Sequence, residues 1–274
     1  MIHPSVWTGY YIEHNVEECV LRLKQAGFDY SEICHGHADM LLAQGKPEQM
    51  GLQLRKFLEK EGFALTQGHL RYSPALADEA STDWHKRELE LFLAIGIRNA
   101  VLHFNGGYDL SPEERFEKRL EQLRKLQEFV KGTDLYLCLE NLGSVPETHT
   151  AQRLVSIIEA AGGENLGICL DTGHLHLVNG RGEATQSQRE FILTAGKYLR
   201  ALHITENNGK NDVHQMPYSA RFGIDWSQVV STLREIGSEG LFNFEALGEN
   251  KAPAPIKEAK LRFMRQMSTY MLEA

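Results

Sequence analysis

Residues 135–140 read LYLCLE and residues 166–171 read LGICLD, with a helix-like stretch at 150–161 between them. The same order, a short apolar run and then a longer amphipathic segment, repeats along the whole chain. Apolar residues in the longer segments recur at three- and four-residue steps, as from Phe116 to Leu120. This alternation predicts parallel strands joined by helices, as in an α/β protein.

Eight strands and eight helices are expected. The strands lie near 2–7, 28–34, 64–69, 99–104, 135–140, 166–171, 199–204 and 241–246, and the helices near 14–26, 47–61, 84–95, 113–131, 150–161, 186–197, 226–237 and 255–272. Eight strand–helix pairs at this length predict a (β/α)8 TIM barrel. A doubly wound open sheet shares the alternation, but no Gly-x-Gly-x-x-Gly follows the first strand. Because no Pro/Ser-rich linker interrupts residues 1–274, we expect a single domain.

The composition is that of an ordinary globular protein, with 42% hydrophobic and 24% charged residues. The formal net charge of −8 and the lack of a basic stripe weigh against a non-specific nucleic-acid binder. Neither a secretory signal nor an apolar run of about 18 residues is present, so no membrane association is expected. Four cysteines without CxxC spacing, Cys19, Cys34, Cys138 and Cys169, are typical of reduced core thiols in a cytoplasmic protein.

Potential metal ligands stand at the ends of six consecutive predicted strands, from the third to the eighth. They are His69, His103, Glu140, Asp171, His203 and Glu245. In a TIM barrel the functional groups stand at the carboxyl ends of the strands. The residues two positions earlier share the inner face and are mostly compact, which supports inward-facing ligands: Gln67, Val101, Cys138, Cys169, Ala201 and Asn243. The sequence therefore predicts a metal site at the barrel mouth.

Further candidates flank this set. His174 follows the sixth strand in an Asp-Thr-Gly-His turn, and Asp212 and His214 lie in a long polar loop, 205–223. Glu32 ends the second strand and could bind a substrate hydroxyl or pair with a basic group. Helix capping or a salt bridge is the alternative role for Asp171 and Glu140, and a solvated loop for Asp212 and His214. Mixed histidine and carboxylate ligands suit Mn, Co, Zn or Mg without choosing among them.

Several motifs resemble the xylose isomerase-like TIM barrel superfamily of sugar and sugar-phosphate isomerases and epimerases, which is related to type IV apurinic endonucleases. The motifs are GHLRYSPALAD, VLHFNGG, LENLG, CLDTGH, LHITEN, DVH followed by FGIDW, and FNFEALG, and they extend over essentially the whole chain. The resemblance implies one divalent metal ion held by Glu140, Asp171, His203 and Glu245. It also implies that His174 contacts the substrate or a second metal.

The endonuclease branch of that superfamily uses three zinc ions. Candidates for the additional ligands are all present: His69, His103, His174, Asp212 and His214. However, Val213 stands where the endonuclease usually has arginine, and FGIDW resembles the isomerase-like stretch. The preferred hypothesis is therefore a sugar isomerase or epimerase; a metal-dependent dehydratase or lyase, and a zinc-dependent apurinic endonuclease, are the alternatives.

The expected reaction is proton abstraction next to a carbonyl through an enediolate, with Glu140 and Glu245 exchanging the roles of base and acid. Glu32 and His174 would orient hydroxyls, and loop 205–223, with Arg221, would close over the substrate. The expected partner is a small sugar, polyol or keto compound. A homo-oligomer is compatible with the sequence, and a non-catalytic sugar-binding barrel is a further alternative.

Overall fold

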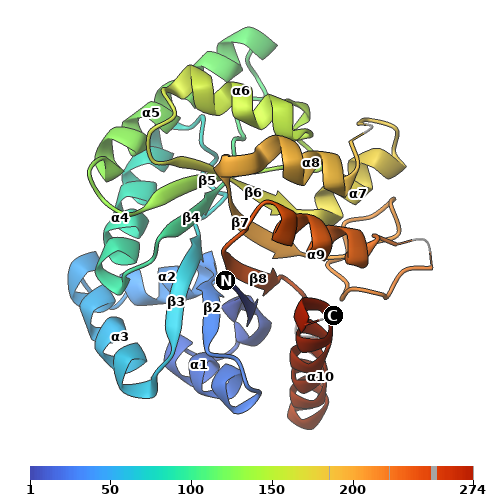
Figure 1. The fold of residues 1–274 in the computed structure, drawn as a ribbon. Helices are drawn as coiled ribbons and strands as arrows, with labels where there is room; N and C mark the ends of the chain where they lie inside the picture. Colours follow the sequence, from blue (N-terminus) through green and yellow to red (C-terminus); the bar gives the residue numbers. More distant parts are fainter. Residues whose placement is uncertain (185, 222, 248–251, 274) are drawn as a thin grey trace.

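The computed structural model describes residues 1–184, 186–221, 223–247 and 252–273. Its eight parallel strands form a closed barrel in sequence order, surrounded by helices (Figure 1). The strands are β1 (Ile2–Val6), β2 (Tyr30–Ile33), β3 (Ala64–His69), β4 (Asn99–Leu102), β5 (Tyr136–Glu140), β6 (Leu166–Asp171), β7 (Leu199–Ile204) and β8 (Gly240–Phe244). The predicted (β/α)8 barrel is confirmed.

The helices include the eight predicted ones and two that were not predicted. Among the described residues, the α-helices are α1 (Val16–Gln25), α2 (His35–Leu42), α3 (Pro47–Glu61), α4 (Glu79–Ile95), α5 (Pro112–Val130), α6 (Ala151–Ala161), α7 (Thr172–Gly180), α8 (Gln188–Ala195), α9 (Trp226–Glu235) and α10 (Ala254–Glu273). Short 3-10 turns lie at η1 (Thr8–Tyr11), η2 (Pro146–Thr148) and η3 (Gly196–Tyr198). The additional helices, α2 and α7, are short and follow β2 and β6 closely. Within the described ranges, no helix is long and apolar enough to cross a membrane.

Helix ends follow the local sequence. Ser111 caps α5 in a capping box with Glu114, as Ser-Pro-Glu-Glu predicts. Gly62 and Gly96 end α3 and α4 in the left-handed conformation, which glycine adopts without steric cost. These caps fix where each helix stops and therefore where the next strand enters the barrel.

The barrel interior beneath the mouth is filled by compact side chains. Val101, Cys138, Cys169 and Ala201 form a separate buried cluster there. The larger aliphatic residues pack outside, between strands and helices. All four cysteines are buried and unpaired. The inner face inferred from period-two alternation is therefore confirmed, and it leaves the strand ends free to carry polar groups.

Candidate metal centre

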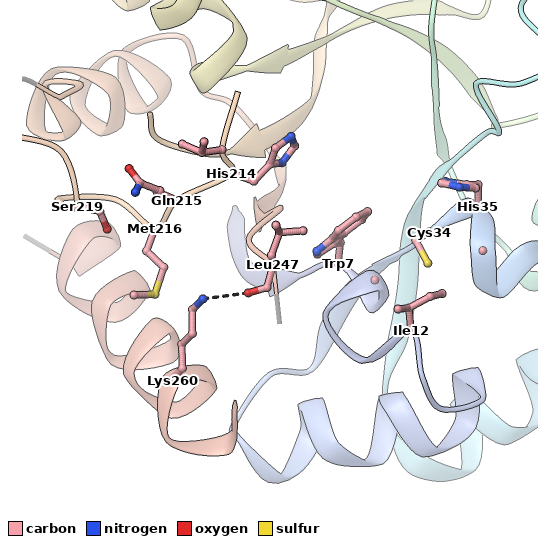
Figure 2. A pocket seen from close by; sticks show the side chains of 13 residues that line it. Trp7, Ile12, Cys34, His35, His214, Gln215, Met216, Ser219, Leu247 and Lys260 are labelled. Atoms are coloured by element: carbon pink, nitrogen blue, oxygen red, sulfur yellow. Dashed lines mark hydrogen bonds between the residues drawn. The ribbon is translucent and has the colours of Figure 1, made fainter. Parts of the chain in front are cut away.

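A pocket of about 570 Å³ opens at the carboxyl end of the barrel (Figure 2). Its walls come from the turn after β1, the start of α2, the loop after β7 and helix α10. His214 and His35 lie on its barrel side, and Met216 and Lys260 lie toward α10. The ends of the strands thus meet a cavity large enough for a small-molecule ligand.

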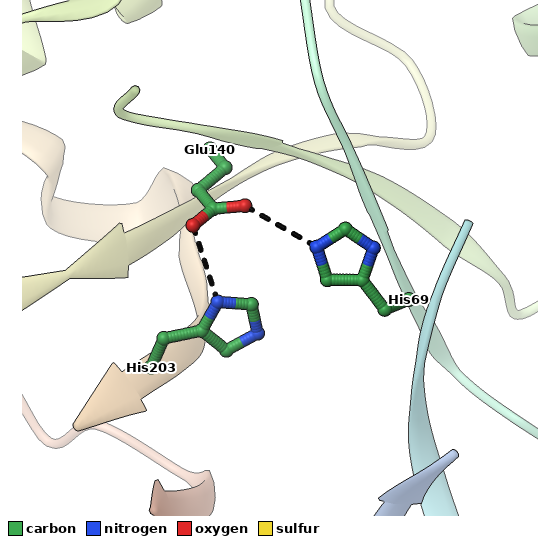
Figure 3. Close-up of side chains that lie close together, drawn as sticks. All are labelled: His69, Glu140 and His203. Carbon is green, nitrogen blue, oxygen red and sulfur yellow. Dashed lines mark hydrogen bonds and ion pairs between the residues drawn. The ribbon is translucent and has the colours of Figure 1, made fainter. Parts of the chain in front are cut away.

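Glu140 stands at the centre of the mouth, between two imidazoles (Figure 3). Its Oε2 atom lies 3.5 Å from His69 Nε2, and its Oε1 atom lies 3.2 Å from His203 Nδ1. His103 Nε2 lies 2.8 Å from the same Oε2 atom. One carboxylate therefore contacts histidines from three strand ends.

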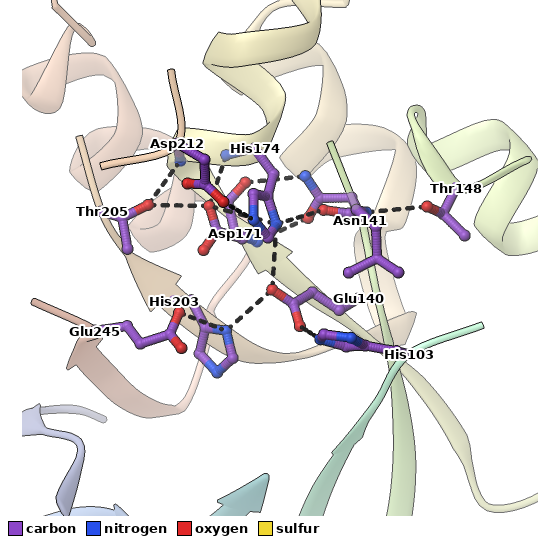
Figure 4. Close-up of polar contacts among 12 residues, drawn as sticks. His103, Glu140, Asn141, Thr148, Asp171, His174, His203, Thr205, Asp212 and Glu245 are labelled. Atoms are coloured by element: carbon purple, nitrogen blue, oxygen red, sulfur yellow. Dashed lines mark hydrogen bonds and ion pairs between the residues drawn. The ribbon is translucent and has the colours of Figure 1, made fainter. Parts of the chain in front are cut away.

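Four ligand atoms of Glu140, Asp171, His203 and Glu245 lie within 4.8 Å of one another, and all four residues are buried. Figure 4 shows them around His203, whose Nδ1 atom lies 3.3 Å from Glu245 Oε2. They come from β5, β6, β7 and the end of β8. The family resemblance implied this group of four, and the structure brings its ligand atoms together.

The hydrogen-bond partners of Asp171 show whether these four residues suit a cation. Its Oδ1 atom accepts hydrogen bonds from the His174 backbone N–H at 2.6 Å and from Thr205 Oγ1 at 3.0 Å. Its Oδ2 atom is buried and has no hydrogen-bond partner within the described part of the chain. A buried anionic oxygen without a partner is costly, and a divalent cation satisfies it. The residues present therefore fit a metal ion.

A further group lies beside the first. Asp212 Oδ2 accepts a hydrogen bond from His174 Nε2 at 3.1 Å, and Asp212 Oδ1 lies 3.4 Å from His214 Nε2. His174 Nδ1 also lies 3.3 Å from Glu140 Oε1, and His214 Nδ1 lies 3.5 Å from Glu245 Oε2. Of the two loop candidates, His214 therefore contacts a central carboxylate, whereas Asp212 is exposed and reaches the centre only through the two histidines.

The two glutamates differ in their proton affinity. Burial alone would raise the pKa of Glu140, yet the imidazoles of His203 and His103 hold that pKa well below its ordinary value. Burial raises the pKa of Glu245, against the opposing effect of His203 and His214. Burial would lower the pKa of His214, but hydrogen bonding to Asp212 and the charge of Glu245 raise it to about 10. Two neighbouring carboxylates whose pKa values are shifted in opposite directions are typical of an acid–base pair.

Glu32 borders the central group through His203, whereas Arg221 lies in the loop after β7. Glu32 is fully buried, and its Oε2 atom accepts from His203 Nε2 at 2.9 Å and from the side-chain amide of Gln67. Arg221 is exposed in the loop after β7, and the next residue, Phe222, lies outside the described residues. Neither residue belongs to the three candidate metal-binding groups of the described chain.

Two polar residues that hold the site together were not predicted. The Asn141 side chain donates to Asp171 O at 2.9 Å and accepts from Asp171 N at 2.7 Å. Thr205 binds the Asp171 carboxylate. Each follows closely after a ligand, within LENLG and LHITEN, so the motifs contained the signal.

Comparison with known proteins identifies a matching family model and solved structures with a similar fold. The model of a family described as xylose isomerase-like TIM barrel matches residues 20–267. D-psicose 3-epimerase from Clostridium cellulolyticum H10 has a similar structure, with a TM-score of 0.78, 18% identity and complete coverage of both chains. The 3-keto-D-glucoside 4-epimerase YcjR from E. coli has a TM-score of 0.76 and 16% identity, over 97% of this chain and 100% of that one. The protein y4fM of Sinorhizobium fredii (strain NBRC 101917 / NGR234) is 24% identical over 165 residues, which are 58% of this chain and half of that protein's length.

Proposed function

The chain belongs to the xylose isomerase-like TIM barrel family, and from that premise we propose that it is a divalent-metal-dependent sugar isomerase or epimerase. The observation that carries the proposal is the buried group Glu140, Asp171, His203 and Glu245, with an unsatisfied oxygen on Asp171. The similarity in fold to proteins named as sugar epimerases supports the substrate class.

A divalent ion, Mn, Co, Mg or Zn, would be held by these four side chains. When bound, it would polarise the carbonyl and its neighbouring hydroxyl and stabilise negative charge developing on oxygen. Glu32 would position His203, because its carboxylate holds Nε2 and thereby leaves Nδ1 facing the other ligands.

The proton transfers fall to the two glutamates. Glu140, whose low pKa keeps it ionised, would accept the proton next to the carbonyl. Glu245, whose pKa is raised by burial, would deliver a proton, and the two would exchange roles in the reverse direction. His174 would orient a substrate hydroxyl or help hold a further cation, and Arg221 would contact the substrate when its loop closes.

A zinc-dependent apurinic endonuclease is the second candidate, and one observation favours it. The described chain contains three possible metal-binding groups rather than one: His69–Glu140–His203 shares two residues with the central group, and His174–Asp212–His214 shares none. The net charge of −8 opposes a phosphate-rich partner. A dehydratase or lyase of a polyol or keto acid would use the same four ligands.

The decisive experiment combines metal analysis with solvent exchange. Metal-stripped protein is reconstituted with Mn²⁺, Co²⁺, Mg²⁺ or Zn²⁺ and incubated in D₂O with ketoses, aldoses and keto-glycosides. We expect about one equivalent of metal and deuterium at a carbon next to the carbonyl. Three zinc equivalents with cleavage of an abasic-site duplex would establish the endonuclease instead, and loss of water from the substrate would establish the dehydratase.

A further inference from the structure

We propose that the substrate carries a neutral apolar substituent on its sugar, as an aryl or alkyl glycoside does, and that the pocket in Figure 2 binds that substituent. The sugar part of this inference rests on the proposed function. The substituent part rests on how the pocket is built, on what charges line it and on how it joins the metal centre.

Trp7 forms a fixed wall of the pocket. Its Nε1 atom donates to Ala246 O at 3.0 Å, which ties the indole to the residue after Glu245. Gly9 lies against the indole so closely that a Cβ atom there would stand 2.8 Å from three ring atoms. Any larger residue at position 9 would displace the indole. The ring is therefore held in place as an apolar surface, and a flat hydrophobic group can pack on it.

Ile12 forms the neighbouring wall in the same way. A Cβ atom at Gly36 would stand 2.7 Å from Ile12 Cδ1, so the glycine at the start of α2 makes room for this side chain. Both glycines line the pocket themselves. The positions of both apolar side chains thus depend on a glycine whose backbone packs directly against them, Gly9 against Trp7 and Gly36 against Ile12.

The rim of the pocket exposes large apolar side chains. Leu247 is 53% exposed and Val213 is 40% exposed, and both line the cavity. Met216 lies beyond them toward α10 (Figure 2). Exposed apolar groups gathered around one cavity mark a surface that a hydrophobic ligand covers.

The cationic groups that line the pocket are already paired: His214, whose pKa is raised to about 10, lies 3.4 Å from Asp212 Oδ1 and 3.5 Å from Glu245 Oε2. No Asp or Glu lines the described pocket, and Lys260 is its one Lys or Arg; the ammonium of Lys260 donates to Leu247 O at 2.9 Å. Phosphate is usually bound by arginine forks or converging backbone N–H groups. Sugar hydroxyls need a matching set of polar partners; Gln215 and Ser219 line part of the pocket, but its walls at Trp7 and Ile12 offer none.

The pocket joins the metal centre directly. His214 lines it, and His214 Nδ1 lies 3.5 Å from Glu245 Oε2. His35 lines it too and meets the ring of His69 edge-on, with 6.3 Å between centroids. A sugar bound at the four ligands would therefore place a substituent on one of its outer oxygens in this cavity.

The test compares binding of three probes to metal-loaded protein by calorimetry: phenyl 3-keto-β-D-glucopyranoside, its methyl analogue and D-fructose 6-phosphate. We expect the phenyl compound to bind about tenfold more tightly than the methyl compound, because an added aromatic group leaves water. The variant Leu247→Asp places a charge on the rim and should remove most of this preference. Leu193→Asp is the matched control, since Leu193 is also exposed, at 41%, but lies on α8 away from the pocket.

Equal affinities for the phenyl and methyl compounds, tightest binding of the phosphate, or the same loss of preference in both Asp variants would overturn the inference. Solvent exchange into the same probes separates the two proposals. A phenyl preference without exchange into any probe supports the pocket and contradicts the isomerase; exchange without a preference does the reverse.

Discussion

The two ends of the barrel differ in how their polar and charged side chains are paired. At the amino end lies a cleft of about 880 Å³ whose lining includes aromatic rings stacked on a histidine or an arginine. His3 lies on Tyr30 with 4.1 Å between ring centroids, and the Arg200 guanidinium lies 3.5 Å from the centroid of Tyr136. At the carboxyl end, by contrast, histidines and carboxylates crowd together.

The difference lies in which polar groups are left without partners. At the amino end Gly167 makes room for Arg200, whose Cδ atom lies 2.9 Å from where a Cβ atom of residue 167 would be. At the carboxyl end, Asp171 Oδ2 and Glu32 Oε1 are buried without a hydrogen-bond partner in the described chain. Because unsatisfied buried oxygens cost stability, we expect the ligand at this end and a purely structural role for the other.

The largest expected effect is at Glu140 and Glu245. We expect Glu140→Gln and Glu245→Gln each to lower solvent exchange into a keto sugar by about 10² to 10⁴, because each removes a proton-transfer group. Exchange is measured by NMR in D₂O with matched metal loading. Glu239→Gln, at the exposed amino end, is the control and should keep the wild-type rate. Wild-type exchange in either of the first two variants contradicts their assigned role.

Metal removal should affect stability at the carboxyl end. Adding a divalent ion to stripped protein at 100 times its Kd should stabilise the fold by about 2.7 kcal/mol, measured as a rise in Tm. Asp171→Asn keeps an acceptor for the His174 N–H and should fold, but it should lose most of this rise. An unchanged rise in that variant would show that the ion binds elsewhere.

Substitution of Glu32 distinguishes two roles for this residue: positioning of His203 and direct binding of the substrate. If it positions His203, Glu32→Gln should weaken metal binding about 10- to 100-fold, measured by competition with a chelating dye. The Tm of the stripped protein checks that the variant remains folded. Wild-type metal affinity combined with a raised KM would instead favour the hydroxyl contact that the sequence suggested.

The smallest expected effect is at the amino end. Arg200→Met preserves length and apolar contact but loses the cation over Tyr136, so we expect a loss of about 1 kcal/mol of unfolding free energy. Urea unfolding measures that loss, and solvent exchange should stay at the wild-type rate. A large fall in exchange would show that the two ends are coupled, contrary to the comparison above.

Most of the fold and the six strand ends that carry possible ligands could be predicted from one periodicity, whereas the choice of four central ligands among them followed from the family resemblance. Strand ends spaced by about one strand–helix unit must meet on one rim of a parallel barrel, which brings Glu140 and Asp171 together. Helix α7 was missed, because its nine residues contain histidines, glycines and little apolar periodicity.

The complete burial of Glu32 could not be predicted from the sequence. The pairing of β2 with β3 shifts register between Ser31 and Glu32, which alternation alone does not reveal. The pocket beside the metal centre was also not predicted, because its walls at Trp7 and Leu247 are 240 residues apart in the chain. Such contacts are set by tertiary packing rather than by local pattern.

Asp171 divides its two oxygens between two tasks: Oδ1 caps α7, and Oδ2 is left for the cation. Asparagine can perform the first task but not the second, and a single nucleotide change converts an aspartate codon into an asparagine codon. A protein with asparagine at position 171 would keep helix α7, the barrel and the apolar pocket but would lose the oxygen proposed to bind the cation. On the proposed function, one nucleotide change therefore separates this enzyme from a protein with the same fold and no activity.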